Sequence, residues 1–284
     1  MPVETQINGG TARVRTGSNA NYPVRFISNE LSLSEIGTFH QLELNAAAGG
    51  SENAFSIYEF DGEQTSYAKF EMFIDNNSAT YEFLLGSGGS FGANTGQIGN
   101  TFTGIEFSVD ESGEITARRR ISNGFSTSTD IDIFESNTKY SIEIFANNST
   151  SSQKYHYNGV EFSLNEANWS IWVNGELKLN NRTSGALDNG LNLDGFMFIA
   201  KNSPESGGTM YIDNIVYSNS LPDILTIEGG EGWRMLATPM DGVTVGQLSL
   251  QNLVQGISGS EYPSPDFLPN IFTSHPGQND PEGL

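Results

Sequence analysis

Apolar and polar residues alternate along much of this chain, with the period of two that is typical of half-buried β-strands. The clearest alternating segments are 67–74, 80–85, 104–109, 114–120, 138–145, 169–173 and 195–200. Turn-forming residues separate them, for example Asp75-Asn76-Asn77 and Asp110-Glu111-Ser112-Gly113. Strands at this spacing predict an all-β sandwich or barrel.

Two β-hairpins are predicted from Asn-Gly pairs. Asn174-Gly175 lies between two alternating arms in segment 169–179, and both residues accept the positive φ angles of a type I′ turn. Asn158-Gly159 predicts a second hairpin. Its first arm contains Tyr155 and Tyr157, and its second arm contains Val160 and Phe162.

The strand pattern ends after Tyr217. Leu221-Pro222-Asp223 is typical of a linker, and prolines at 263, 265, 269, 276 and 281 disfavour regular structure in the last part of the 284-residue chain. We therefore expect a sandwich over residues 1–220 and, over 221–284, a mostly irregular extension made of a linker and a partial or truncated module.

Composition narrows the possible partners and compartment. Asp and Glu number 34 against 13 Lys and Arg, so the charge of −21 disfavours nucleic acid. The absence of cysteine excludes disulfides, thiolate zinc sites and a thiol nucleophile. No apolar run approaches the ~20 residues of a membrane span, and Met1-Pro2-Val3-Glu4 does not resemble a signal peptide.

Three segments in order resemble the second half of a concanavalin A-like or laminin-G-like domain. They are Lys139-Tyr140-Ser141-Ile142-Glu143-Ile144, then Trp172-Val173-Asn174-Gly175, and finally Met210-Tyr211-Ile212-Asp213-Asn214-Ile215-Val216-Tyr217. The resemblance covers residues 12–218 and implies an antiparallel jelly-roll β-sandwich in which the third segment is the closing strand.

Segment 232–239, which begins Gly232-Trp233-Arg234, resembles the opening of a β-module that recurs in large bacterial surface proteins. The resemblance implies an extracellular or cell-surface protein of bacterial origin. It also implies that the chain is a piece of a longer exported polypeptide and that its partners include other surface-protein modules.

Carbohydrate binding is the chemistry that the aromatic residues favour, because a ring covers the apolar face of a sugar while amides bind its hydroxyls. Trp169, Tyr155 and Tyr157 lie around the two hairpins, with Asn168 beside them. If Trp172 packs in the core, strand parity leaves Trp169 exposed. We therefore expect a polysaccharide or glycan site at these four residues.

Calcium has candidate ligands in Asp75-Asn76-Asn77, Asp188-Asn189 and Asp213-Asn214, because Ca²⁺ prefers hard oxygen ligands. The same residue types also form turns for conformational reasons alone. Asp213 is the best single candidate, since the resemblance implies that closing strands contribute to structural calcium sites.

Catalysis is the alternative to binding. Asp130-Ile131-Asp132-Ile133-Phe134-Glu135 resembles the Glu-x-Asp-x-x-Glu motif of sandwich glycoside hydrolases, but Asp130 is one carbon short and Glu135 has the opposite strand parity. The other interpretation of this segment is a polar strand leading into 138–145.

A lyase site could use His40 with Arg118-Arg119-Arg120, of which at most two arginines share a strand face. The chain has no Gly-x-Ser-x-Gly motif, which disfavours a serine hydrolase. It has three histidines, and His156 is expected at a solvent-facing strand position. We therefore predict a non-catalytic extracellular binding or adhesion module, with a polysaccharide-active hydrolase or lyase and a structural surface spacer as alternatives.

Overall fold

The computed structural model describes residues 3–5, 9–15, 24–28, 40–46, 52–89, 99–122, 124–201 and 207–224. These residues are nearly all β, as the alternating pattern predicts. Among them, no helix combines the length and the apolar character that a membrane crossing requires.

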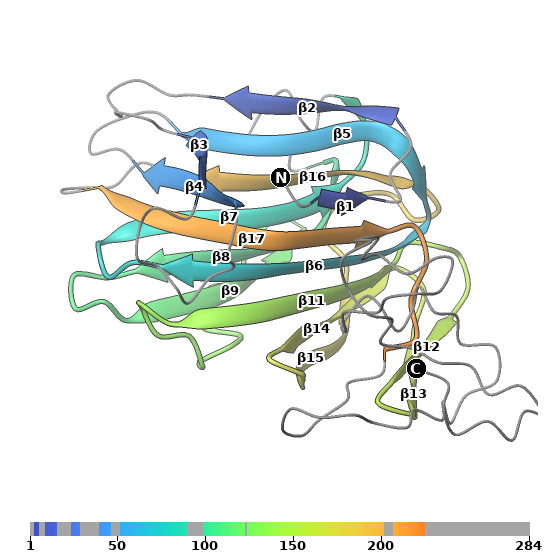
Figure 1. Cartoon of the computed structure of the whole chain (residues 1–284). Coiled ribbons are helices and arrows are strands. Elements are labelled where there is room, and N and C mark those ends of the chain that lie inside the picture. Colours follow the sequence, from blue (N-terminus) through green and yellow to red (C-terminus); the bar gives the residue numbers. More distant parts are fainter. Residues whose placement is uncertain are drawn as a thin grey trace, which may run out of the picture. The chain divides into compact units, whose positions relative to one another are not determined.

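The first large sheet has the order β15-β14-β11-β6-β17-β4-β3, with the short β1 pairing in parallel with β17 (Figure 1). Its strands are β1 (Val3–Thr5), β3 (Val24–Ser28), β4 (His40–Ala46), β6 (Thr65–Ile74), β11 (Lys139–Asn147), β14 (Asn168–Val173), β15 (Glu176–Thr183) and β17 (Gly208–Ser218). The predicted closing strand, β17, therefore lies inside the eight-stranded sheet, between β6 and β4.

The second large sheet has the order β10-β9-β8-β7-β16-β5-β2, and its pairs are antiparallel. Its strands are β2 (Gly9–Arg15), β5 (Asn53–Glu63), β7 (Ala79–Gly86), β8 (Thr101–Val109), β9 (Ile115–Ile121), β10 (Gly124–Phe125) and β16 (Leu193–Ala200). The two sheets face each other as the layers of a sandwich (Figure 1), which confirms the predicted fold class.

Both predicted hairpins form. Asn174 and Gly175, with φ angles of 50° and 79°, join β14 to β15. Asn158 and Gly159, at 50° and 78°, join β12 (Gln153–Tyr157) to β13 (Val160–Leu164), which form a separate two-stranded sheet. The Asn-Gly pairs supply the left-handed backbone that a tight two-residue turn needs.

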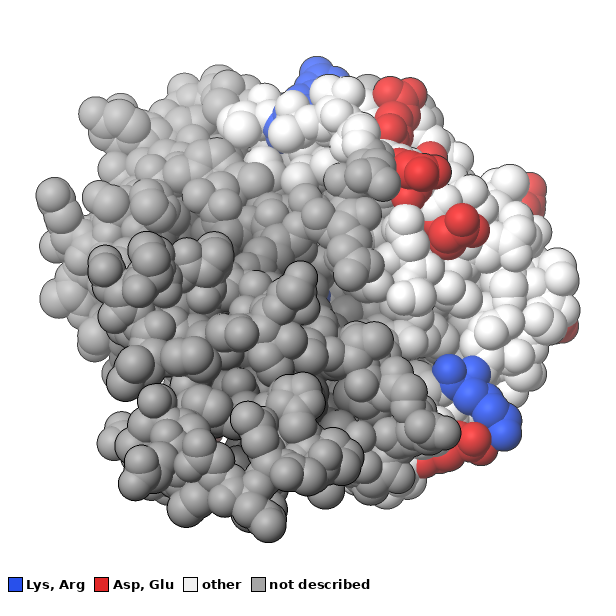
Figure 2. Space-filling view, turned by 45° about the vertical axis from the view of Figure 1, so that its right-hand side comes forward, with Lys and Arg blue, Asp and Glu red and all other residues white. Residues whose placement is uncertain are grey.

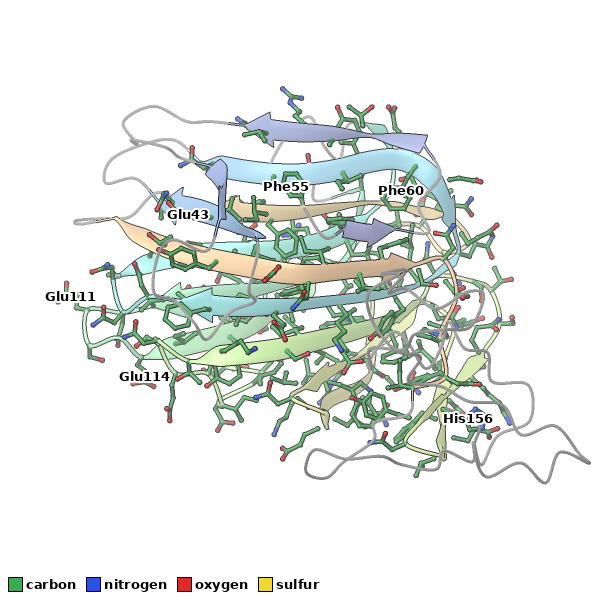
Figure 3. All side chains as sticks on the ribbon, viewed as in Figure 1. Glu43, Phe55, Phe60, Glu111, Glu114 and His156 are labelled. Carbon is green, nitrogen blue, oxygen red and sulfur yellow. The ribbon has the colours of Figure 1, made fainter. Side chains whose placement is uncertain are left out.

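The hydrophobic core lies between the two large sheets, because alternate residues of each strand point to the same side. Phe70 of β6 packs against Phe83 of β7 and Phe198 of β16, with ring centroids 4.9 and 5.0 Å apart. Phe55 and Phe60 of β5 enter the same core (Figure 3). Burial of these large rings is the main favourable contribution to folding.

The chain divides into two compact units. The first comprises residues 1–154 and 163–221 and contains both large sheets. The second comprises residues 155–162, which include the tip of the β12–β13 hairpin, together with residues 222–284. The predicted extension over 221–284 lies, beyond Ile224, outside the described residues.

Candidate functional site

Charged side chains alternate with core residues along the strands of the seven-stranded sheet. On β7 and β8, Phe83 and Phe107 point into the core, so Glu82 and Glu106 point to the opposite, outer face. Glu82 is 4% exposed although it lies outside the main core. This outer face is therefore a buried polar surface, an arrangement that costs free energy unless its groups are paired.

The strand register aligns the side chains of this outer face in rows. One row runs across six strands: Arg118 (β9), Glu106 (β8), Glu82 (β7), Ile199 (β16), Ala54 (β5) and Arg15 (β2). The next row includes Gly104, Leu84, Met197, Ser56 and Arg13. Arg120 lies on the same face as Arg118, two residues further along β9.

Ion pairs connect the carboxylates of the first row to cations. The Arg118 guanidinium pairs with Glu106 across the β8–β9 ladder. Lys201, which directly follows β16, places Nζ 3.1 Å from Glu82 Oε1 and 2.6 Å from Glu52 Oε1. Glu82 and Glu106 are direct cross-strand neighbours, and two like charges in that position repel each other.

Burial acts in opposite directions on the pKa values of Glu82 and Lys201. Desolvation raises the pKa of Glu82 to about 6, opposed by the nearby Lys201 ammonium and reinforced by Glu106. For Lys201, desolvation lowers the pKa, but the Glu82 and Glu52 carboxylates outweigh it and the pKa lies above its ordinary value. One carboxyl of the Glu82–Glu106 pair thus holds its proton more tightly than a free glutamate does.

Arg120 is the least exposed of the cations on this face. It is 6% exposed, and its Nε atom, like that of Arg118, is buried without a hydrogen-bond partner. Its guanidinium carbon lies 5.2 Å from the centroid of the Phe125 ring on β10. Burial lowers the pKa of Arg120, while Glu82 and Glu106 oppose that shift.

A small apolar cluster adjoins the charged row. Its members are Ala54, Leu84, Met197 and Ile199, with the partly buried Phe125 packed against them. The face therefore combines an apolar strip with carboxylates and guanidinium groups at its border. Ala54, Leu84, Met197 and Ile199 are at most 3% exposed, so of this cluster the Phe125 ring is the part that a ligand could reach.

The outer face of the eight-stranded sheet has a different character, because aromatic residues dominate it. The Tyr67 hydroxyl donates a 2.6 Å hydrogen bond to Glu143 Oε2, and the Tyr67 and Phe145 ring centroids lie 5.0 Å apart. Trp172 is the cross-strand neighbour of Glu143. Glu43, on β4 (Figure 3), Glu71 and Asp213 add carboxylates to the same face.

The predicted exposure of Trp169 is wrong. Trp169 is 0% exposed and belongs to the core cluster, with Nε1 donating to the Thr183 carbonyl at 3.3 Å. Trp172 instead faces outward from the sheet and is still 6% exposed. The two residues do have opposite parity, but the assignment of faces was reversed, and both faces of β14 are buried.

The other residues of the predicted sugar site are buried or hydrogen-bonded within the protein. Tyr155 and Tyr157 on β12 are buried, and Tyr155 stacks on Phe162 with 5.5 Å between centroids. The Asn168 amide donates to the Asn181 carbonyl at 2.9 Å. The three rings therefore present no exposed aromatic platform, because packing within the protein covers their faces.

The calcium candidates occupy turns and a strand. Asp75 accepts hydrogen bonds from the Asn77 and Thr209 backbone N–H groups, as in a turn stabilised by its side chain. Asp213 is buried on β17, beside a register shift, and accepts from the Asn214 N–H at 2.8 Å. Within the described ranges, no three His, Cys, Asp or Glu side chains gather to hold a metal ion, and calcium at Asp213 stays a prediction.

The possible hydrolase motif lies beside β9 and makes single bridges rather than a strand of its own. Asp130 pairs with Arg119, whose Nε lies 3.1 Å from Oδ1, while Ile131 and Phe134 enter the core. Asp132 and Glu135 are exposed. The segment thus caps the sandwich edge, where Asp130 serves as an acceptor for Arg119.

Of the lyase candidates, the arginine triplet follows the predicted parity. Arg118 and Arg120 share the outer face, whereas Arg119 points the other way toward Asp130. His40 begins β4, but its side chain lies outside the described residues. His156 is partly exposed, with Nδ1 3.0 Å from Asp223 Oδ1.

Glu82 and Glu106 were missed as candidate site residues. Each is a single carboxylate in a predicted strand that otherwise alternates between apolar and polar residues. The signal in the sequence was therefore a charged residue within a strand that is otherwise typical of the protein interior. Recognising their proximity requires the β7–β8 register, which the sequence does not give.

Figure 2 shows one side of the surface, on which acidic side chains are spread over the described part and basic ones occur at few places. This view agrees with the acidic composition of the chain. It gives the background against which the cations on the seven-stranded sheet are unusual.

No protein-family model and no curated protein matches the chain. Similar solved structures include the cellulose-induced protein Cip1, with 11% identity and a TM-score of 0.44 over 77% of this chain and 90% of that chain. A sialidase matches with 9% identity and a TM-score of 0.43 over 72% of this chain and 18% of its own.

The carbohydrate recognition domain of Emp46p matches with 10% identity and a TM-score of 0.36 over 61% of this chain and 81% of that chain. All three TM-scores lie below 0.5, so these likenesses identify neither a family nor a ligand nor a reaction for this chain.

Proposed function

We propose that this protein is an extracellular, non-catalytic carbohydrate-binding module of a bacterial surface protein, whose glycan lies at the β9–β10 edge of the outer face of the seven-stranded sheet. One observation carries the proposal: at this edge the partly buried Phe125 ring packs against Arg120, on the same face as the ion pair between Glu106 and Arg118, whose side chain is 33% exposed. A sugar offers the matching chemistry, an apolar ring face edged by hydroxyl groups.

The ion pairs support this assignment because they hold the polar groups in fixed positions. Arg118 orients Glu106, and Lys201 orients Glu82, so neither carboxylate must be ordered when a ligand binds. Preorganised groups lose less conformational entropy on binding, which favours affinity. Structural calcium at Asp213 remains part of the proposal, and it predicts a stabilising effect of the ion rather than a contact with sugar.

The experiment is a polysaccharide binding screen of the full chain, with and without calcium, together with two matched variants. Glu106→Gln removes a carboxylate from the proposed face, and Glu143→Gln removes one of similar burial from the other sheet. We expect Glu106→Gln to weaken binding about tenfold, the size typical of a charged hydrogen bond, and Glu143→Gln to leave it unchanged. If Glu143→Gln weakens binding and Glu106→Gln does not, the glycan lies on the eight-stranded sheet. No binding by the unmodified protein would favour a structural spacer.

A second candidate function is glycoside hydrolysis at the same place. Glu82 and Glu106 are direct cross-strand neighbours with different environments, since Glu106 forms an ion pair with Arg118 while burial raises the pKa of Glu82 to about 6. A carboxylic acid beside a carboxylate is the arrangement that cleaves glycosidic bonds.

Release of reducing or unsaturated sugar ends during the binding screen separates this candidate from pure binding. If hydrolysis occurs, Glu82→Gln abolishes product release while binding persists, because the amide cannot donate the proton. Binding without product supports the non-catalytic function.

A further inference from the structure

The edge strands of the two large sheets differ in how well they are protected against the addition of a further strand. Among those whose side chains are described, β10 has only two residues, and β15 pairs with β14 through two register shifts. β2 has seven residues, keeps one register with β5 throughout, and is the outermost strand of its sheet (Figure 1). Short length and irregular pairing protect an edge, so β2 is the least protected of these strands.

The backbone of β2 is accessible to solvent. Six of its seven residues are exposed, among them Gly9 and Gly10, which have no side chain to contribute that exposure. In an antiparallel pair, alternate residues direct their N–H and C=O groups to opposite sides, so about half of those groups in β2 point away from β5. Within the described ranges no strand pairs with that side of β2, and an added strand would bind there.

The inner side of β2 lies at the border of the core. Val14 is the cross-strand neighbour of Phe55, and such neighbours point to the same side of a sheet. Phe55 lies in the core and is 2% exposed, whereas Val14 is 46% exposed. An added strand with an apolar residue beside Val14 would cover this surface and gain free energy from its burial.

The outer side of β2 carries positive charge. Arg13 and Arg15 are cross-strand neighbours of Ser56 and Ala54, and no ion pair among the described residues involves either arginine. An acidic residue opposite an arginine on an added strand forms a favourable cross-strand pair. Two copies of β2 side by side would bring the arginines of both copies together, and like charges repel. The edge therefore favours an acidic strand over a second copy of itself.

We propose that β2 is an interaction edge that binds an extended segment of another protein, in which acidic and apolar residues alternate. The segment adds a strand to the seven-stranded sheet. Its acidic residues lie beside Arg13 and Arg15, and its apolar residues lie beside Ala12 and Val14. The β2 edge is at the opposite end of the strand order from β9 and β10, so this proposal is independent of the glycan site.

The acidic character of the chain opposes such a partner only weakly. The net charge is −21, but physiological salt screens charges beyond about 8 Å. On β5, the exposed Glu59 lies between the partners of Gly9 and Thr11, about 10 Å along the strand from the level of Arg13. The two arginines are therefore the charges that an added strand meets at the far end of β2.

The test measures binding of a fluorescently labelled peptide to the full chain by anisotropy at physiological salt. The peptide has capped ends and seven residues, the length of β2, with valine and glutamate in alternation. A second peptide has lysine in place of glutamate. We expect the glutamate peptide to bind about tenfold more tightly than the lysine peptide, because attraction to two arginines is replaced by repulsion.

Pairing of the backbone is tested with two methylated forms of the glutamate peptide. One form carries methyl groups on the valine nitrogens and the other on the glutamate nitrogens, so each lacks the N–H groups on one side of the added strand. We expect one form to lose about tenfold in affinity and the other to bind as the parent peptide does. Equal binding of both forms and the parent would mean that side chains alone attract the peptide, and it would overturn strand addition.

Arg13→Glu and Arg182→Glu form a matched pair of variants, since both arginines are exposed on edge strands, one in each large sheet. We expect Arg13→Glu to bind the glutamate peptide about fivefold more weakly and the lysine peptide more tightly. This exchange of preference cannot result from misfolding. Arg182→Glu should leave both affinities unchanged, and an equal effect of the two variants would overturn the assignment to β2.

Failure of the full chain to bind the glutamate peptide would overturn the proposal. Sedimentation of the full chain then shows whether it forms a dimer, as expected if a second copy occupies the edge instead. Glycan binding by Arg13→Glu should equal that of the unmodified protein, so this experiment and the glycan screen fail separately.

Discussion

The outer faces of the two sheets show how one architecture can carry two different surfaces. On the eight-stranded sheet, Tyr67, Phe145 and Trp172 surround Glu143, and further carboxylates follow on neighbouring strands. On the seven-stranded sheet, a buried apolar strip borders a network in which Arg118 and Lys201 form ion pairs with glutamates. Both sheets direct large aliphatic and aromatic side chains into the shared core. The sheets therefore resemble each other on their inner faces and differ on their outer faces.

The contrast also teaches which buried polar groups are satisfied. Glu143 receives a hydrogen bond from Tyr67, a neutral partner on the adjacent strand. Arg120 has no hydrogen-bond acceptor for its Nε, although it is buried to a similar degree. The two faces therefore differ in how completely the hydrogen-bonding groups of their buried charged residues are paired.

The largest effect that tests this comparison is expected at Trp172. Trp172→Ala should lower the free energy of unfolding by about 3–5 kcal/mol, because it removes a large buried ring. Chemical denaturation measures this loss. The milder Trp172→Phe should stay folded and bind glycan as the unmodified protein does, and a folded variant that loses binding would show that the ligand occupies the aromatic face.

A smaller loss is expected from the hydroxyl of Tyr67. Tyr67→Phe leaves the ring in place and removes the donor to the Glu143 carboxylate, so the free energy of unfolding should fall by about 1.5–3 kcal/mol. The matched variant Tyr217→Phe removes a donor to the Leu193 carbonyl, a neutral acceptor, and should cost about 1 kcal/mol. Equal losses in the two variants would contradict a special role for the charged acceptor.

The smallest predicted effect depends on pH and concerns Glu82. Because its pKa is raised to about 6 in the folded protein, the folded state binds its proton more tightly than the unfolded state, whose pKa is near 4.5. This contribution to stability is complete below pH ~4.5 and is lost as pH rises through about 6. It amounts to at most about 2 kcal/mol.

Urea unfolding of the unmodified protein and of Glu82→Gln between pH 4 and pH 7 checks this prediction. The difference in unfolding free energy between them should change by at most about 2 kcal/mol over that interval, with the unmodified protein losing stability relative to the variant as pH rises. Glu106→Gln provides the control on the adjacent strand. Parallel curves for the unmodified protein and Glu82→Gln would mean that Lys201 fully compensates the burial of Glu82.

Much of the fold followed from local patterns. The period of two located β6, β7, β8, β9, β11, β14 and β16, and the Asn-Gly pairs placed both hairpin turns. The parity of the arginine triplet was also confirmed, since alternation along a single strand is a local property.

The candidate site was much less predictable. The aromatic residues near the hairpins were expected to be exposed, but Trp169 lies in the core and Tyr155 and Tyr157 are buried. Parity establishes that Trp169 and Trp172 point to opposite faces, yet it does not say which face meets the other sheet or whether the outer face is covered.

The sequence by itself determined that this protein is built of strands, where several of them lie, and which of its turns are tight, because alternation and turn chemistry act over a few neighbouring residues. Only the tertiary structure decided which strands are neighbours. Glu82 and Glu106 are 24 positions apart in the chain, and Arg118 and Arg15 more than a hundred, yet one register places all four in a single row. That register depends on long-range packing of both sheets around a common core, which no local pattern encodes.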